Sequence, residues 1–295
     1  MSRAKRAGKT DFPDRVATSE ILIDGAPATT EDLIHQALVN YGSYTSFRVE
    51  DGATRGLDLH VARLEQAAVE LFGESPGQAE LRRLMARAVA GRDACWLRVS
   101  LFSPEIGHRT PSFVGCPRVM TAVSPPPPPL ASGMRLTLTP YVRETPHLKH
   151  VATLGLIRAR RAARAAGFDD ALFVDADGHV SEGALWNIGF VQAGRIVWPQ
   201  APMLAGVTQA LIARGLENAG VDQITRPVSR DEIAAFDGAF LCNSATPAGA
   251  ITAIDGHAFA ADPALLDRVE QAWRAAPAQT IGASDDDDGV TRLGR

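Results

Sequence analysis

The sequence predicts an α+β protein with two lobes, and three observations support this class. Segments that alternate between polar and apolar residues, as strands do, are interspersed with segments of helical periodicity. The length of 295 residues suggests one large domain or two modest ones. Five consecutive prolines at 125–129 can join neither a helix nor a sheet, and they favour a stiff polyproline II segment. We therefore expect a small N-terminal α/β lobe and a larger C-terminal lobe joined by a Pro-rich linker.

The composition along the chain divides it further. Residues 1–19 are polar and aperiodic, and we expect them to form a flexible N-terminal arm. A run of four aspartates near the C-terminus predicts that 281–295 is a flexible acidic tail. The segments between these ends are expected to be a small domain, an interdomain linker and a large domain, at 20–124, 125–133 and 134–280.

The small lobe is expected to combine two strands with a long helix. Residues 44–50 alternate as a strand does and end at the Asp-Gly turn at 51–52, which is typical of a tight hairpin. Apolar residues recur at helical spacing over 57–71. Residues 96–102 predict a second strand, and its alternation places Arg98 on the face opposite the apolar side chains.

The large lobe is expected to begin with a strand at 134–139 and a helix over 152–166. Short apolar runs between Asp-Gly or Gly turns predict the later strands, and apolar residues at helical spacing predict the later helices. These are strands at 171–174, 188–191, 195–197, 239–242 and 249–254, and helices at 208–219 and 263–275.

Composition and charge exclude several classes of protein. The net charge of −4 leaves no basic field for a nucleic-acid backbone. No stretch approaches the ~18 apolar residues that a membrane span needs, and no apolar segment follows the basic N-terminus as in a secretory signal. Three widely spaced cysteines predict no disulfide framework and no zinc pair, so we expect a cytoplasmic protein. His147 and His150 have no third ligand nearby, which predicts no metal site.

Four features could carry chemistry. Lys149 lies between a Pro-containing extended stretch and a predicted helix, and Glu182 lies in a turn of small residues after a hairpin. Val207 and Thr208 open a predicted helix, where free N–H groups and a hydroxyl suit a phosphate. Arg63 lies on the long helix of the small lobe. Each feature alone is equally explained as a surface lysine, a loop acid, a helix cap or an exposed arginine.

Together, the four features supply the groups that pyridoxal 5′-phosphate requires: a lysine for an imine, an acid for the pyridine nitrogen, and an arginine and a helix N-terminus for the phosphate. At these positions the sequence resembles the class IV, fold-type IV pyridoxal-phosphate enzymes. That family includes branched-chain and D-amino-acid aminotransferases, (R)-selective amine transaminases and aminodeoxychorismate lyase. The matching segments follow one another in order over about 20–260: 41–45, 48, 51–52, 60–64, 148–150, 167–187, 204–208, 242–244 and 254–256.

The resemblance implies a fold-type IV structure and a role for nine residues. Lys149 would form the Schiff base with the cofactor, and Glu182 would pair with the pyridine nitrogen. The phosphate would be held by Arg63, Val207 through its backbone N–H, Thr208 and Ser244. The substrate would be bound by Tyr44, Thr45 and Arg98.

The residues leave more than one activity open. A class IV aminotransferase, favoured by Arg98 and by the run 182–187, would move an amino group between an amino acid or amine and a 2-oxo acid. An aminodeoxychorismate-lyase-like enzyme is favoured by Thr45, by the run 148–150 and by the non-aromatic Leu154. A non-catalytic cofactor- or phosphate-binding protein is the third possibility, although a binder needs no electron sink. Because relatives are homodimers, the resemblance also implies a homodimer.

Overall fold

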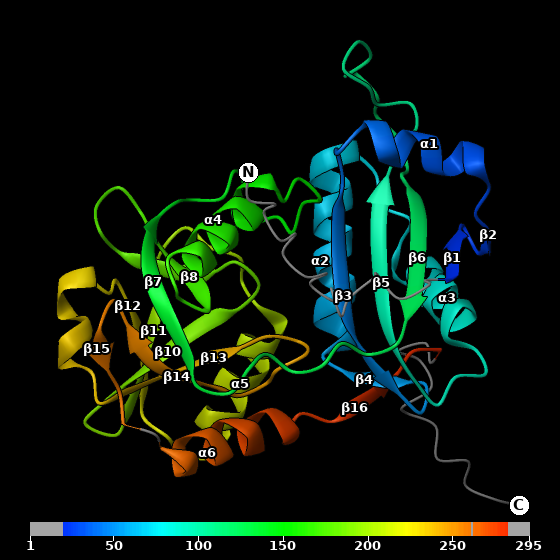
Figure 1. Cartoon of the computed structure of the whole chain (residues 1–295). Coiled ribbons are helices and arrows are strands. Elements are labelled where there is room, and N and C mark those ends of the chain that lie inside the picture. Colours follow the sequence, from blue (N-terminus) through cyan, green and yellow to red (C-terminus); the bar gives the residue numbers. More distant parts are fainter. Residues whose placement is uncertain (1–19, 261, 283–295) are drawn as a thin grey trace, which may run out of the picture.

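The computed structural model describes residues 20–260 and 262–282, so the expected N-terminal arm and nearly all of the expected acidic tail lie outside the described residues. Two β-sheets with their helices form two lobes, and residues 125–133 run from one lobe to the other without forming a helix or a strand (Figure 1). The α+β class predicted from the sequence is confirmed.

The small lobe contains an antiparallel sheet of seven strands in the order β16-β4-β3-β5-β6-β1-β2. In the register of β3 and β5, Tyr44 lies opposite Ser100, and Ser46 lies opposite Arg98. Side chains alternate between the two faces of a sheet, so these four residues share one face and Thr45 lies on the other. The strands are β1 (Glu20–Ile23), β2 (Ala26–Pro27), β3 (Ser43–Glu50), β4 (Ala53–Arg55), β5 (Ala94–Phe102), β6 (Arg118–Ser124) and β16 (Ala278–Thr280).

Helices α2 (Leu57–Phe72) and α3 (Gln78–Val89) cover the Thr45 face of this sheet (Figure 1). The core between them and the sheet includes Leu64, Leu84 and Leu97, each of which is at most 1% exposed. The predicted helix over 57–71 and the predicted hairpin at 51–52 are confirmed. Helix α3 was not predicted, although its buried residues recur at helical spacing.

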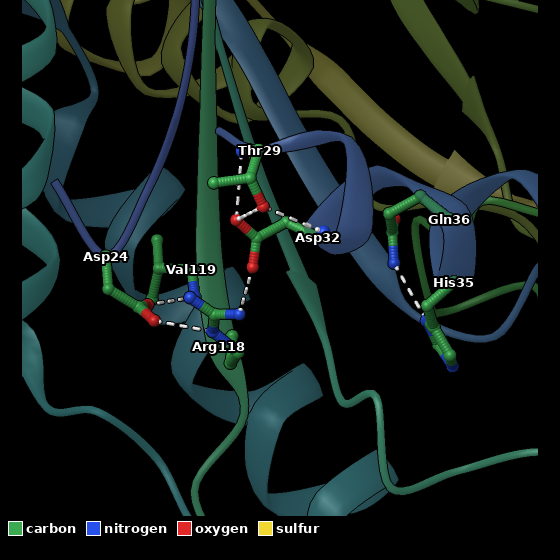
Figure 2. Close-up of polar contacts among 7 residues, drawn as sticks. All are labelled: Asp24, Thr29, Asp32, His35, Gln36, Arg118 and Val119. Atoms are coloured by element: carbon green, nitrogen blue, oxygen red, sulfur yellow. Dashed lines mark hydrogen bonds and ion pairs between the residues drawn. The ribbon is translucent and has the colours of Figure 1, made fainter. Parts of the chain in front are cut away.

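Arg118, at the start of β6, fastens the N-terminal corner of the small lobe (Figure 2). Its guanidinium donates to Asp24 at 2.7 Å and to Asp32 at 2.6 Å. The Asp32 carboxylate also accepts from the backbone N–H and the hydroxyl of Thr29, as part of a capping box at the start of α1 (Thr30–Leu38). These Thr29 hydrogen bonds, together with Arg118, lower the pKa of Asp32 to about 2. Because no residue of α1 is buried, polar contacts at this corner hold the helix in place.

The large lobe contains a nine-stranded sheet that closes on itself. Its main order is β12-β11-β10-β13-β14-β7-β8-β9, β15 pairs with β14, and β9 also pairs with β10 through Glu182 and Asn187. This last pairing joins β10, β13, β14, β7, β8 and β9 into a closed ring around a core that includes Leu136, Leu172 and Phe190. The strands are β7 (Met134–Pro140), β8 (Asp170–Val174), β9 (Val180–Gly183), β10 (Asn187–Gln192), β11 (Arg195–Pro199), β12 (Gln223–Arg226), β13 (Gly238–Cys242), β14 (Gly249–Ile254) and β15 (His257–Ala258).

The helices of the large lobe lie outside this ring (Figure 1). Helix α4 (Leu154–Ala165) packs on β8, whereas α5 (Val207–Asn218) and α6 (Pro263–Arg274) pack on each other. A short 3-10 helix, η1, spans Arg230–Ala235. All the strands and helices predicted for this lobe are present, with ends that agree to within two residues. Within residues 20–260 and 262–282, no helix is both long and apolar enough to cross a bilayer.

The last described residues, 278–282, return to the small lobe, whereas the expected division assigned residues up to 280 to the large domain. Strand β16 follows α6 and pairs antiparallel with β4 (Figure 1). Ile281, expected to begin a flexible tail, is 1% exposed and belongs to the small-lobe core. The residues of β16 carry no apolar alternation, and only the pairing with β4 makes them a strand.

Replacing Ile281 by Ala should destabilise the protein by about 2–5 kcal/mol, because it removes a buried side chain and leaves a cavity in the small lobe. Replacing Ile224, which is 39% exposed on β12, should cost much less. Urea unfolding of both variants measures the difference. Equal losses would mean that the C-terminal segment does not pack on the small lobe in solution.

Candidate active site

A cavity of about 240 Å³ lies where the two lobes and the linker meet. The linker contributes Pro127, Pro128 and Leu130 to its wall. Most of the residues predicted for the site line this cavity: Tyr44, Arg63, Lys149, Glu182, Val207, Thr208 and Ser244. The fold thus brings together residues that are far apart in the sequence, from both lobes.

Lys149 is held in place by backbone hydrogen bonds to the small lobe. The N–H of Tyr44 donates to the carbonyl of Lys149 at 2.9 Å, and the N–H of Val151 donates to the carbonyl of Gly42 at 3.0 Å. The Lys149 ammonium lies 4.9 Å from the centroid of the Tyr44 ring. The start of β3 therefore positions this lysine, which precedes the first residue of α4.

The environment of Lys149 makes it an unusual lysine. Burial, reinforced by the positive charges of Arg63 and Arg143, lowers its pKa to about 7. An ordinary lysine has a pKa near 10.4 and is almost wholly protonated at neutral pH. A substantial fraction of Lys149 is instead the free amine, which is the nucleophilic form.

Glu182, on β9, is 5% exposed and faces the same cavity. One of its oxygens accepts the N–H of Leu204 at 3.3 Å and lies 3.7 Å from a guanidinium nitrogen of Arg143. Burial raises the pKa of Glu182 to about 7, against the opposing effects of Arg143, the Leu204 hydrogen bond and Lys149. The carboxylate is therefore placed to pair with a cationic group of a bound molecule.

Asn187 lies opposite Glu182 across the seam that closes the strand ring. Its side-chain N–H donates to the carbonyl of Leu204 at 2.9 Å, so Leu204 contacts both seam residues. A Cβ at Gly206 would lie 2.0 Å from the side-chain oxygen of Asn187, so any other residue here would displace the Asn187 side chain. Glycine at this position lets α5 begin directly against the seam.

The start of α5 provides groups for an anion. Its N-cap is Gly206, which offers no side chain, so the first N–H groups of the helix have no side-chain cap. The hydroxyl-bearing residues Thr208 and Ser244 line the same cavity, and Thr208 is not the helix cap. Arg63 reaches from α2 to the carbonyl of Ala205, just before this helix. Free N–H groups, hydroxyls and an arginine are the donor set that a phosphate needs.

Thr45 is the one predicted substrate residue on the opposite face of β3. It is fully buried, and its hydroxyl lies 2.6 Å from Nδ1 of His60. Burial lowers the pKa of His60 well below its ordinary value, so this ring is neutral. The structure does not bring Thr45 to the cavity; it brings Ser46 there instead.

Arg98 lies on the cavity side of the small sheet but contacts Tyr44 rather than the cavity itself. Its guanidinium carbon is 3.6 Å from the centroid of the Tyr44 ring, and its Nε donates to the hydroxyl of Ser100 at 3.2 Å. Burial lowers the pKa of Arg98, an effect that Tyr44 opposes. Arg98 would therefore affect a bound molecule through Tyr44, which lines the cavity.

Sequence reasoning missed Arg143, Ser46 and Trp96, all of which line the cavity. The alternation of β3 and β5 would have identified Ser46 and Trp96, because they share a face with Tyr44 and Arg98. Nothing in the local sequence distinguishes Arg143 from the many exposed arginines of the chain.

The histidines and acids that could suggest a metal have other partners. His147 contacts the carboxylate of Glu70 at 2.9 Å, whereas Nε2 of His150 contacts the carbonyl of Glu144 at 2.8 Å. Asp175 lies with Asp177 and His179 on a turn, where its carboxylate accepts the N–H groups of both residues. None of these residues lines the cavity.

The family model for amino-transferase class IV matches residues 42–254, which is more than half of the chain. The chain belongs to the class IV aminotransferase family. A protein of Methanocaldococcus jannaschii with the provisional name branched-chain-amino-acid aminotransferase is 26% identical over 249 residues, covering 79% of this chain and 85% of that protein. The branched-chain-amino-acid aminotransferase of Pseudomonas aeruginosa is 27% identical over 128 residues, covering 39% of this chain and 42% of that protein.

Solved structures show the same fold. The branched-chain aminotransferase of Thermoproteus uzoniensis with norvaline has a TM-score of 0.74 at 21% identity, covering 90% of this chain and 96% of that one. The branched-chain amino acid aminotransferase of Escherichia coli has a TM-score of 0.75 at 20% identity, covering 91% and 97%. The predicted fold-type IV class is confirmed.

Membership of this family makes the chain a pyridoxal-phosphate-dependent aminotransferase, as the sequence predicted. The residues present fit this cofactor. The start of α5 has no side-chain cap, and Arg63, Thr208 and Ser244 line the same cavity, so donors for a phosphate are present. At the other side of the cavity, Lys149 and Glu182 offer an amine and a carboxylate.

Replacing Lys149 by Met should stabilise the cofactor-free protein at pH 7. Because the folded protein binds the Lys149 proton less tightly than the unfolded chain does, unfolding takes up a proton between about pH 7 and 10.5. Wild-type stability therefore rises with pH over this interval relative to Lys149→Met, and the advantage of the variant shrinks. Urea unfolding at both ends of the interval measures the change. A constant difference would show that Lys149 keeps its ordinary pKa.

Proposed function

We propose that the chain transfers an amino group between an amino acid or amine and a 2-oxo acid, with Lys149 as the residue that binds the cofactor covalently. The observation that carries this proposal is the meeting of Lys149 and Glu182 in one cavity, with both pKa values moved to about 7. Lysine usage supports the same residue. The 30 basic residues include three lysines, at positions 5, 9 and 149, so Lys149 is the single lysine after residue 9.

The catalytic roles follow from the two shifted groups. When bound, pyridoxal 5′-phosphate supplies a conjugated ring that accepts the electron pair left at Cα of the substrate. Lys149 can take the Cα proton as a base and return it as an acid at the C4′ atom, because its pKa lies near neutrality. Glu182, as a carboxylate, favours a proton on the pyridine nitrogen and so increases the electron demand of the ring.

The phosphate would be held at the start of α5. Arg63 supplies a charge-assisted donor from the small lobe, and the N–H of Val207 supplies one from the helix. Thr208 and Ser244 supply hydroxyls that line the same cavity. These donors come from α2, α5 and the loop after β13, so a bound phosphate would contact both lobes.

The substrate would lie between these groups and the apolar wall. Tyr44 faces the Lys149 ammonium, and Arg98 stacks on Tyr44, so we assign the substrate carboxylate to this side. Trp96 and the linker residues Pro127 and Leu130 give the wall an apolar character that suits an apolar substrate side chain. The names of the relatives, which refer to branched-chain amino acids, support the same substrate class.

The other predictions from the sequence stay proposals. A lyase of the aminodeoxychorismate type would use the same Lys149 and Glu182, and a panel of amino donors, 2-oxo acids and aminodeoxychorismate distinguishes the two reactions. A non-catalytic binder would have no use for a lysine with a lowered pKa. A homodimer and a cytoplasmic location are proposed on the resemblance and on cysteine usage, and all three cysteines are free.

Borohydride treatment of the protein with pyridoxal 5′-phosphate should label Lys149, because reduction converts the covalent link into a stable secondary amine. Peptide mapping by mass spectrometry identifies the labelled residue, and a Lys5→Arg/Lys9→Arg variant is the matched control. Lys149→Arg should lose both the label and amino transfer, since a guanidinium stays protonated. Full turnover by Lys149→Arg would refute the proposed function.

Arg63→Ala should weaken cofactor binding more than Thr208→Val. Loss of a charge-assisted hydrogen bond to a phosphate costs on the order of a hundredfold in affinity, whereas loss of one neutral hydroxyl costs on the order of tenfold. The N–H groups at the start of α5 remain in both variants. Equilibrium titration of the cofactor-free proteins with pyridoxal 5′-phosphate tests the order. An unchanged affinity in Arg63→Ala would remove Arg63 from the phosphate site.

A further inference from the structure

Arg143 is a buried arginine in the cavity for which the reaction described above has no role. It lies between the end of β7 and Lys149 and is 6% exposed. One terminal nitrogen donates to the carbonyl of Leu148 at 2.8 Å, and the other lies 3.7 Å from Glu182. Its Nε is buried with no hydrogen-bond partner. One guanidinium thus contacts both the residue before the lysine and the carboxylate.

The position of Arg143 is costly for a residue that only fills space. A buried guanidinium loses hydration that must be replaced by charge pairing and hydrogen bonds, and here one donor stays unpaired. The pairing that it does make is with the carboxylate of the site. The contacts of Arg143 are therefore with Glu182 and with the backbone before Lys149.

Three cations surround Glu182: Arg143, Lys149 and Arg63, and the N–H of Leu204 completes its polar environment. Lys149 loses its charge whenever it acts as a nucleophile or a base. Arg63 already donates to Ala205 and is the arginine proposed for the phosphate. Arg143 is the permanently charged cation of this set that lies within ion-pair distance of Glu182, at 3.7 Å.

We propose that Arg143 is a positioning residue that favours the ionised form of Glu182 and fixes the backbone that carries Lys149. The inference rests on the proposed function, because only there does an ionised Glu182 matter. Without Arg143, burial would act on Glu182 with less opposition, and the carboxyl would keep its proton to higher pH. A neutral Glu182 gives no preference for a protonated pyridine nitrogen.

The decisive measurement is a pH titration of the Glu182 carboxyl in the full-length protein. Infrared difference spectroscopy monitors the carboxyl band, both without and with pyridoxal 5′-phosphate. The band is assigned by its absence in Glu182→Gln. In Arg143→Gln the midpoint should move to higher pH by about one unit or more, as expected for loss of a neighbouring opposite charge. Arg143→Lys, which retains the charge, should recover most of this shift.

Two further variants keep the test decisive. Arg143→Met preserves the volume of the side chain and gives the same comparison if Arg143→Gln does not fold. Arg226→Gln is the matched control, because Arg226 is a partly buried arginine that pairs with Glu232 at 2.8 Å and does not line the cavity. It should leave the Glu182 midpoint unchanged.

The outcomes separate this inference from the proposed function. An unchanged midpoint in Arg143→Gln, or an equal shift in Arg143→Lys, would overturn the role of Arg143 while leaving amino transfer by Lys149 intact. Labelling of Lys149 by borohydride tests the proposed function and does not depend on Arg143.

Discussion

The peptide of Leu204 fixes the geometry on which the cavity depends. Its N–H donates to Glu182 and its carbonyl accepts from Asn187, so one residue binds both partners of the pair that closes the strand ring. Two residues later, Gly206 passes so close to Asn187 that a Cβ would not fit, and α5 begins there. The carboxylate and the uncapped helix start are therefore placed relative to each other by one seam, independently of any bound molecule.

The small lobe contacts the large lobe at separate points. The backbone of Tyr44 holds the carbonyl of Lys149, and Arg63 reaches the carbonyl of Ala205. Farther away, β16 extends the small sheet with residues from the C-terminal end of the chain. Because these links involve β3, α2 and β16, the lobes are joined by more than the linker.

Periodicity predicted the elements with strong apolar patterns, such as β5 and α2, because their own residues form the core. It could not predict β16, which is a strand only through its pairing with β4. At the site, the family resemblance placed Lys149 and Glu182 in one cavity, but it assigned Thr45 without regard to the alternation of β3. Arg143 escaped prediction because its significance arises from a contact across the fold with Glu182.

The charges in and around the cavity explain why Lys149, unlike the arginines near it, has a pKa close to 7. Arg63, Arg98 and Arg143 all lower the pKa of Lys149, after burial, and Glu182 alone opposes them. Burial lowers the pKa of Arg63 itself only to about 10, so it remains charged at neutral pH. Among these four cations, Lys149 is the one whose pKa lies near 7, so the repulsion is relieved when Lys149 releases its proton. The positive charge that remains on the arginines favours an anionic ligand. The same charge lowers the pKa of Lys149 and so favours its neutral amine.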